Sequence, residues 1–204
     1  MKFRLFLAIA SLLILSYSLP CHGYEDRPTM AVCFTQAAEH YNIPVELLLA
    51  IAEVESGLSP NAINLAGTSY QPPSRKDADL ILERISGQRA TFDVGIMQVN
   101  RWWFEKYGEP YEKGLDICFN VDFGARILAM AIKDHGFTWE AVGSYHSPTS
   151  WRKNAYARKI FARLSRLLEK RISTPQEKIV DIKTGDLAFK QLPDDPEQTS
   201  ASSQ

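Results

Sequence analysis

Apolar residues recur every three or four positions along most of the central chain, which is the spacing of amphipathic helices. The segment "NIPVELLLAIAEVES" at 42–56 shows this pattern clearly. Its apolar positions fall on one helical face: Leu47, Leu48, Ile51 and Val54. Pro44 suits a first helical turn, and Gly57 directly after the segment favours its end. The pattern therefore predicts a helix that begins near Pro44 and stops at Gly57.

The remaining pattern predicts an all-α domain. Loop composition marks "SPNAINLAGTSYQPP" at 59–73, and "FDVGIMQVN" at 92–100 is interpreted as extended or irregular. From Ser173 onward the periodicity is lost, so 173–204 is predicted to be a disordered, flexible tail. The other segments with helical spacing are 29–41, 74–88, 101–108 (one or two turns), 120–136, 138–148 and 150–171.

The first 23 residues are typical of a secretory signal peptide. Basic residues precede an apolar run that ends near Leu19, and this run is shorter than the roughly 20 residues of a membrane span. Cleavage after Gly23 removes Cys21 and leaves a domain at 24–172 followed by the tail. An uncleaved anchor and a lipoprotein signal ending at Cys21 are the alternatives. Export to the periplasm or cell envelope is the expected outcome.

That cleavage leaves two cysteines, Cys33 and Cys118. In an oxidising compartment two remaining thiols are expected to pair, so the sequence predicts a disulfide between them. Two buried free thiols are the alternative.

Composition narrows the classes of ligand. Hydrophobic residues make up 45% and charged residues 23% of the chain, and the formal net charge is −1. These values are ordinary for a globular protein and give no sign of a nucleic-acid partner. The four histidines have no metal-ligand spacing with one another or with cysteine. We therefore expect neither a metal nor a cofactor.

Glu55 is the first candidate for chemistry. It follows Ile51 by four positions and Leu48 by seven, so the helix places it along the buried stripe, whereas Glu53 is predicted to face solvent. Burial and the negative end of the helix dipole both raise a carboxyl pKa. A glutamic acid that stays protonated near neutral pH can act as a general acid. The alternative is a carboxylate at the stripe's edge that simply reaches water.

The neighbouring motifs suggest a sugar polymer as the substrate. Ser56 is expected to orient the carboxyl group. "GIMQV" offers a backbone approach at Gly95 and an amide at Gln98, and "GSYHS" adds a phenol at Tyr145. Neutral hydrogen-bonding groups suit hydroxyls, and flat apolar surfaces suit sugar faces.

Glu55-Ser56, then "GIMQVN", then "AVGSYHS", in this order, resemble the lytic transglycosylase (SLT) domain of the lysozyme-like superfamily. The resemblance covers roughly 33–168 and is nearest to the small exported transglycosylases of conjugation, pilus and type III or IV secretion systems. It implies a lysozyme-like fold that cleaves the β-1,4 bond between N-acetylmuramic acid and N-acetylglucosamine in peptidoglycan. The family roles implied are Glu55 as sole acid/base, Ser56 as its orienting residue, Gly95, Met97 and Gln98 as groove residues, and Tyr145 as the residue that closes over the site.

Two departures from the family pattern bear on function. His146 stands where the family often has Asn, and we expect it to titrate on the groove rim rather than bind substrate. The segment 69–90 is long for the family, and it is either a helical flap beside the groove or an inert surface insertion.

The products depend on whether a second carboxylate is present. Goose-type lysozymes carry an acidic residue directly after "MQV", where this chain has Asn100, and Asp93 is the nearest other candidate. Without a second carboxylate the expected products carry 1,6-anhydromuramyl ends. The alternatives are a goose-type hydrolase and a non-catalytic peptidoglycan-binding assembly factor. Expected partners are peptidoglycan strands and components of a secretion, conjugation or pilus apparatus.

Overall fold

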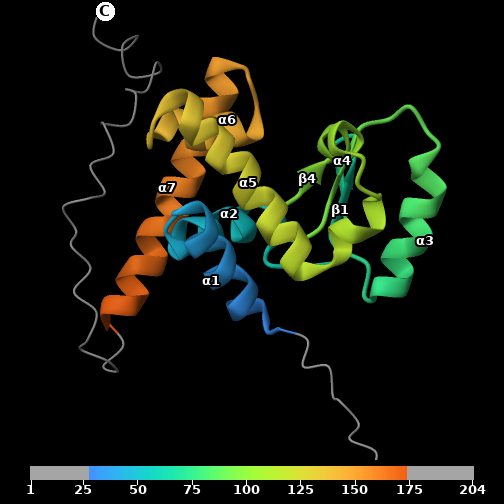
Figure 1. The fold of residues 1–204 in the computed structure, drawn as a ribbon, viewed down its shortest axis with the longest axis horizontal. Helices are drawn as coiled ribbons and strands as arrows, with labels where there is room; N and C mark the ends of the chain where they lie inside the picture. The colour runs from blue at the N-terminus through green and yellow to red at the C-terminus, as the bar shows by residue number, and fades with distance from the viewer. Residues whose placement is uncertain (1–27, 174–204) are drawn as a thin grey trace, which may run out of the picture.

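The computed structural model describes residues 28–173 (Figure 1). The proposed signal peptide and nearly all of the predicted tail lie outside these residues. Most of the described chain is helical, as the pattern predicted. The helices are α1 (Met30–Tyr41), α2 (Val45–Ser56), α3 (Arg75–Ser86), α4 (Arg101–Tyr107), the 3-10 helix η1 (Tyr111–Leu115), α5 (Ile117–His135), α6 (Trp139–His146) and α7 (Ser150–Ser173).

The predicted all-α fold class is confirmed, and the described residues also contain a small antiparallel sheet. Its strand order is β2-β1-β3-β4, with the bounds β1 (Ile63–Leu65), β2 (Thr68–Tyr70), β3 (Phe92–Val94) and β4 (Val99–Asn100). The segment 59–73, predicted to be a loop, contains the hairpin of β1 and β2. Ala66 and Gly67 form its two-residue turn, both at positive φ, which matches the twist of paired strands. Strands of three residues are too short for a period of two to stand out.

Figure 1 shows α1, α2, α5, α6 and α7 gathered on one side, with the sheet, α4 and α3 on the other. Helix α2 lies within the core, and Leu48 and Ile51 are fully buried. Helix α7 crosses α2 and is joined to it by ion pairs of Arg163 with Glu53 and of Arg171 with Glu46. The prediction that Glu53 faces solvent was therefore wrong: its side chain is 16% exposed because α7 covers it.

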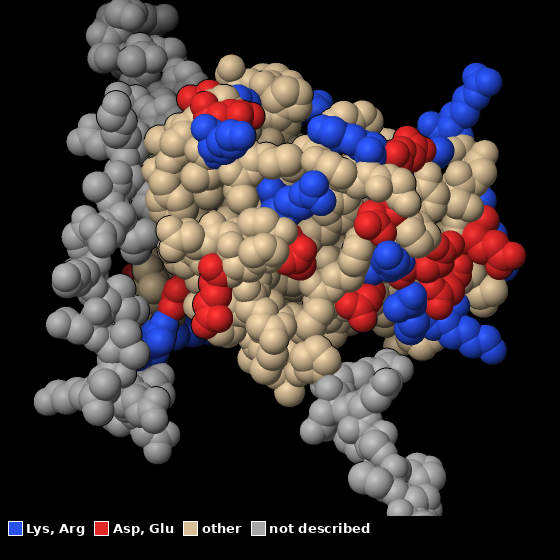
Figure 2. All heavy atoms as spheres, in the orientation of Figure 1, with Lys and Arg blue, Asp and Glu red and all other residues tan. Residues whose placement is uncertain are grey.

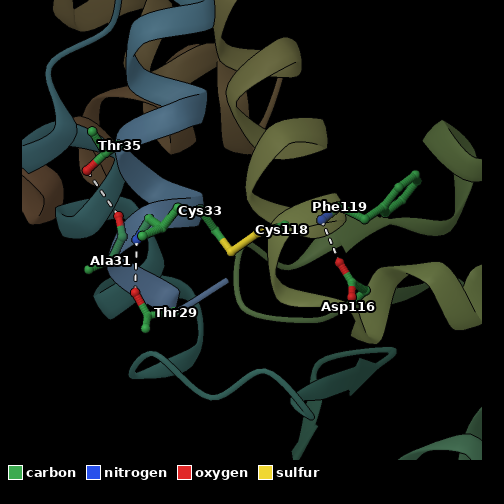
Figure 3. The surroundings of a disulfide bond; sticks show 8 residues. Thr29, Ala31, Cys33, Thr35, Asp116, Cys118 and Phe119 are labelled. Carbon is green, nitrogen blue, oxygen red and sulfur yellow. Dashed lines mark hydrogen bonds between the residues drawn. A yellow bond between two sulfur atoms is a disulfide. The ribbon is translucent and has the colours of Figure 1, made fainter. Parts of the chain in front are cut away.

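The predicted disulfide between Cys33 and Cys118 is confirmed, with the two Cα atoms 4.7 Å apart (Figure 3). It joins α1 to the first turn of α5 across 85 positions of sequence. Helix α5 begins at Ile117, three residues before the expected start at Asn120. The reason is a side-chain cap: the Asp116 carboxylate accepts a hydrogen bond from the Phe119 N–H at 2.8 Å.

Helix α3 confirms that the insertion at 69–90 is partly helical. Ser74 and Asp77 form the expected cap, with the Ser74 hydroxyl accepting from the Asp77 N–H at 3.2 Å. The Arg75 guanidinium donates to the Glu112 carbonyl of η1 at 2.8 Å, which fixes the start of the helix. The helix lies at the far end of the molecule, beyond the sheet, where acidic and basic side chains are mixed on the face shown (Figure 2). Whether it acts as a flap stays a prediction.

Candidate active site

Glu55 lies in the last turn of α2, and Gly57 ends that helix in the left-handed conformation at φ +64°. Although part of the side chain reaches the surface, protein atoms surround the carboxyl group. Burial raises the pKa of Glu55 to about 7, helped by the nearby charge of Asp93 and opposed by Tyr156 and Lys159. The pKa of this carboxyl group therefore lies near neutral pH, which suits a group that both donates and accepts a proton.

Tyr156 of α7 contacts this carboxyl group directly, and sequence reasoning missed it. Its hydroxyl donates a hydrogen bond to Oε1 of Glu55 at 2.5 Å, and the residue is only 4% exposed. A signal was present in the sequence, because Tyr156 precedes Ile160 by four positions and Leu164 by eight on the buried stripe of α7. A phenol on a buried face needs a hydrogen-bond partner, and in the structure that partner is Glu55.

Ser56 does not contact the Glu55 carboxyl group. Its hydroxyl lies 2.7 Å from the Ile96 carbonyl and 3.1 Å from the Ala52 carbonyl, and it accepts from the Ser59 N–H at 3.1 Å. The side chain therefore ties the end of α2 to the "GIMQV" loop. Ser56 thus fixes the backbone next to Glu55. The direct hydrogen bond from Ser56 to the Glu55 carboxyl group that we expected from the sequence is not formed.

Asn120 of α5 holds the other side of the same loop and was also missed. It is fully buried, its Oδ1 accepts from the Met97 N–H at 2.7 Å, and its Nδ2 donates to the Val94 carbonyl at 2.9 Å. The Met97 carbonyl in turn accepts from the Tyr145 hydroxyl at 2.7 Å. The loop is thus fixed by side chains from three helices, because Ser56 binds it from α2.

The loop residues expected to line the groove differ in how far they are exposed. Gly95 is buried and has a φ of +82°. A Cβ at this position would lie 2.0 Å from the Gly114 carbonyl oxygen of η1. The glycine therefore lets η1 pack closely against the loop, and this packing, not the approach of a ligand, is what the structure shows. The Met97 side chain is fully buried. Gln98 is partly exposed and donates its amide to the carbonyls of Gly95 at 2.8 Å and Ala62 at 3.1 Å. Its amide oxygen accepts no hydrogen bond from the described residues, and its role in binding substrate stays a prediction.

The rings of Tyr145 and His146 both stack on the ring of Tyr156. The Tyr145 ring stacks on the Tyr156 ring with centroids 6.4 Å apart, and the His146 ring lies on it at 4.7 Å with an interplanar angle of 4°. Burial, followed by the charges of Glu55 and Asp93, raises the pKa of Tyr145 well above its ordinary value. His146 is exposed. Both "GSYHS" residues therefore pack on the hydrogen-bond partner of Glu55, and neither hydrogen-bonds to the carboxyl group.

Asp93 of β3 is a second carboxylate near Glu55, and its charge acts on the Glu55 pKa. Burial raises the pKa of Asp93 itself. Asn100 faces Asp93 across β3 and β4 and donates to its Oδ1 at 2.7 Å. The Asn100 Oδ1 caps α4 by accepting from the Trp102 N–H at 3.0 Å. The strand pairing thus holds Asp93 in a fixed place near Glu55.

Within residues 28–173, no group of three or more metal-ligating side chains is placed to hold an ion. In the same part of the chain, no helix combines the length and apolar character needed to cross a membrane.

Comparison with known proteins decides the family. The family model described as "Transglycosylase SLT domain" matches residues 32–162, which is well over half of the chain. The chain belongs to the transglycosylase SLT family. It is accordingly a peptidoglycan lytic transglycosylase, and Glu55 with its surroundings lies inside the matched segment.

Individual relatives of this SLT transglycosylase span most of the same segment. It is 33% identical over 147 residues to "Invasion protein IagB" of Salmonella typhi, covering 68% of this chain and 79% of that protein. It is 32% identical over 145 residues to "Protein IpgF" of Shigella flexneri, covering 67% and 82%. A shorter match to "Type IV secretion system protein virB1" of Brucella abortus biovar 1 (strain 9-941) is 36% identical over 85 residues, or 41% and 36% of the two chains.

Proposed function

We propose that the enzyme cleaves the β-1,4 bond between N-acetylmuramic acid and N-acetylglucosamine without water, leaving 1,6-anhydromuramyl ends. The observation that carries this proposal is the state of Glu55, a carboxyl group with a pKa of about 7 and a single direct side-chain partner, Tyr156, among the described residues. Such a group can serve first as acid and then as base.

The reaction needs one proton to leave Glu55 and one to return. Protonated Glu55 gives its proton to the glycosidic oxygen as the bond from muramic acid C1 to that oxygen breaks. The resulting carboxylate then accepts the proton of the muramic acid 6-hydroxyl, whose oxygen bonds to C1. That hydroxyl is attached to the reacting ring, so it attacks at high effective concentration. Tyr156 holds Oε1 throughout, which leaves Oε2 to carry the transferred proton.

A hydrolytic reaction is the second candidate, because Asp93 lies close enough to Glu55 to act on its pKa. Hydrolases of glycosides use two carboxylates, one of which positions water or bonds to the sugar. Against this role, the Asp93 carboxylate already accepts a hydrogen bond from Asn100. We therefore assign Asp93 to the electrostatic support of Glu55.

Analysis of the released muropeptides separates the two reactions. Anhydro ends lack the mass of one water and resist borohydride reduction, whereas hydrolysis gives reducible ends that take up heavy oxygen from isotopically labelled water. The proposal expects anhydro ends and no label. Mainly reducible, labelled ends would establish a hydrolase, and loss of that product in Asp93→Asn would then identify its second carboxylate.

We further propose that the signal peptide at 1–23 directs export and that the mature enzyme, 24–172 with its tail, opens the wall locally for a secretion, conjugation or pilus apparatus. The similarity to a protein named for type IV secretion supports this role. In the source cell, a strain carrying Glu55→Gln should lose assembly or output of the apparatus as a deletion strain does. Normal output in the Glu55→Gln strain would contradict a role for wall cleavage in it.

A further inference from the structure

Some of the basic side chains of helix α7 form salt bridges and others do not. Arg163 and Arg171 form ion pairs with carboxylates of α2, and Lys153 lies 3.5 Å from the Glu140 carboxylate. Arg152 and Lys159 are exposed, and neither forms a salt bridge with another residue in 28–173. Arg166 is likewise exposed and forms no salt bridge with the described residues. Of these three cations, Arg152 and Lys159 lie nearest to Tyr156 in the sequence of α7.

Arg152 and Lys159 flank the residue that holds Glu55. Arg152, Tyr156 and Lys159 are spaced by four and three positions, so they follow one another along one side of α7. After burial, the charges of Lys159 and Arg152 are what lower the pKa of His146, and Lys159 also acts on Glu55. Lys159 is therefore close enough to act on Glu55 itself, and Arg152 is close enough to act on His146, whose ring stacks on Tyr156.

Aromatic surface accompanies these charges. The His146 ring lies flat on Tyr156. Trp151, at the start of α7, is 67% exposed and has the Arg152 guanidinium 5.2 Å from its ring centroid. Exposed aromatic rings beside unpaired cations form a surface suited to an anionic, partly apolar ligand.

We propose that Arg152 and Lys159 bind the carboxylates of the stem peptide on the muramyl residue beside the scissile bond. This inference rests on the proposed function, since it concerns the same site and the same polymer. The sugar rings of peptidoglycan are neutral, so the anions near the scissile bond belong to the substituent on muramic acid. Two cations that have no carboxylate partner among residues 28–173 complement that substituent. The enzyme then prefers strands whose peptides keep their charge.

The test compares one substrate in two forms: soluble peptide-bearing glycan strands, and the same strands after carbodiimide amidation of their carboxylates. The measured quantity is the ratio of kcat/KM on native to amidated strands. The wild type should favour the native strands, and added salt should reduce that preference. Replacing both cations, in Arg152→Ala with Lys159→Ala, should lower the ratio roughly three- to ten-fold, as expected for two exposed ion contacts.

Two further variants serve as matched controls. Arg166→Ala removes an exposed cation of the same helix beyond the site, and it should leave both rates and their ratio unchanged. Lys159→Arg keeps the charge and should retain the preference. A wild-type ratio near one, or a ratio that the double variant does not lower, would overturn the inference while leaving glycan cleavage intact. No cleavage of either substrate would instead count against the proposed function.

Discussion

The Tyr156 hydroxyl donates a 2.5 Å hydrogen bond to Oε1 of Glu55, joining residues 101 positions apart in the sequence. This bond favours the ionised carboxylate and so opposes the effect of burial on the Glu55 pKa. The pKa of about 7 is thus a balance between a buried site and one donor aimed at it.

Tyr156→Phe should move the pH dependence of cleavage to higher pH. The variant keeps the ring beneath His146 but loses the donor that lowers the Glu55 pKa. Because Glu55 must be protonated to act as acid, wild-type kcat/KM should fall as pH rises through about 7, and the fall in the variant should begin later. Profiles of kcat/KM from pH 5 to 9 on soluble glycan strands measure this shift.

Tyr41→Phe is the matched control for that experiment. Its hydroxyl also donates to a carboxylate, Asp122, at 3.2 Å, but on the surface between α1 and α5. Its profile should follow the wild type. If Tyr156→Phe follows the wild type as well, the hydrogen bond does not set the Glu55 pKa.

Glu55→Gln should lose most activity while keeping the fold. The amide preserves shape but cannot supply the proton, and general acid–base assistance contributes about 10²–10⁴-fold. Glu53→Gln is the control: it weakens the ion pair with Arg163, so it should lower the melting temperature slightly and leave the cleavage rate intact. If Glu55→Gln keeps more than about a tenth of the wild-type rate, the loss is smaller than general acid–base catalysis contributes, and Glu55 is not the catalytic acid.

Glu55→Gln should also change how the free energy of unfolding depends on pH. A folded-state pKa raised from 4.5 to about 7 means that the native protein binds more protons than the unfolded chain between those values. Folding stability from this group is therefore full below about pH 4.5 and declines as pH rises through about 7, by on the order of 3 kcal/mol. Denaturant titrations should show Glu55→Gln gaining stability relative to wild type between pH 5 and pH 8. If the free energies of unfolding of Glu55→Gln and wild type differ by the same amount at pH 5 and at pH 8, burial does not raise the Glu55 pKa.

Gly95→Ala should be far more destabilising than Gly67→Ala. Both glycines have positive φ, so both substitutions incur backbone strain of about 1–2 kcal/mol. A Cβ at Gly67 meets no atom within 4 Å, whereas at Gly95 it would lie 2.0 Å from the Gly114 carbonyl and 2.6 Å from the Asn120 side chain. Thermal melts of the two variants measure the difference, and similar melting temperatures would contradict the close approach of η1.

Removing the disulfide by Cys33→Ser with Cys118→Ser should lower stability by about 2–4 kcal/mol, since the bond constrains a long loop in the unfolded chain. Equilibrium unfolding of both proteins in urea provides the comparison. Thiol titration of the denatured, unreduced mature protein should find no free cysteine, and two reactive thiols would show that the bond does not form in the protein.

The helical framework and the position of Glu55 could both be predicted from local sequence patterns. Apolar spacing placed Glu55 on the buried face of α2 and Gly57 at its end, because periodicity and capping are local properties. Export and cysteine number predicted the pairing of Cys33 with Cys118. The motifs around "GIMQV" indicated the family before any contact was known.

Tertiary structure alone decided how the acid is held. Tyr156, Asn120 and the ion pairs of α7 act across long sequence separations, which a local pattern does not encode. The hairpin of β1 and β2 escaped detection because its strands are too short to show a period. The close approach at Gly95 and the turn of Ser56 toward Ile96 arise from packing between elements, and packing exists only once the chain has folded.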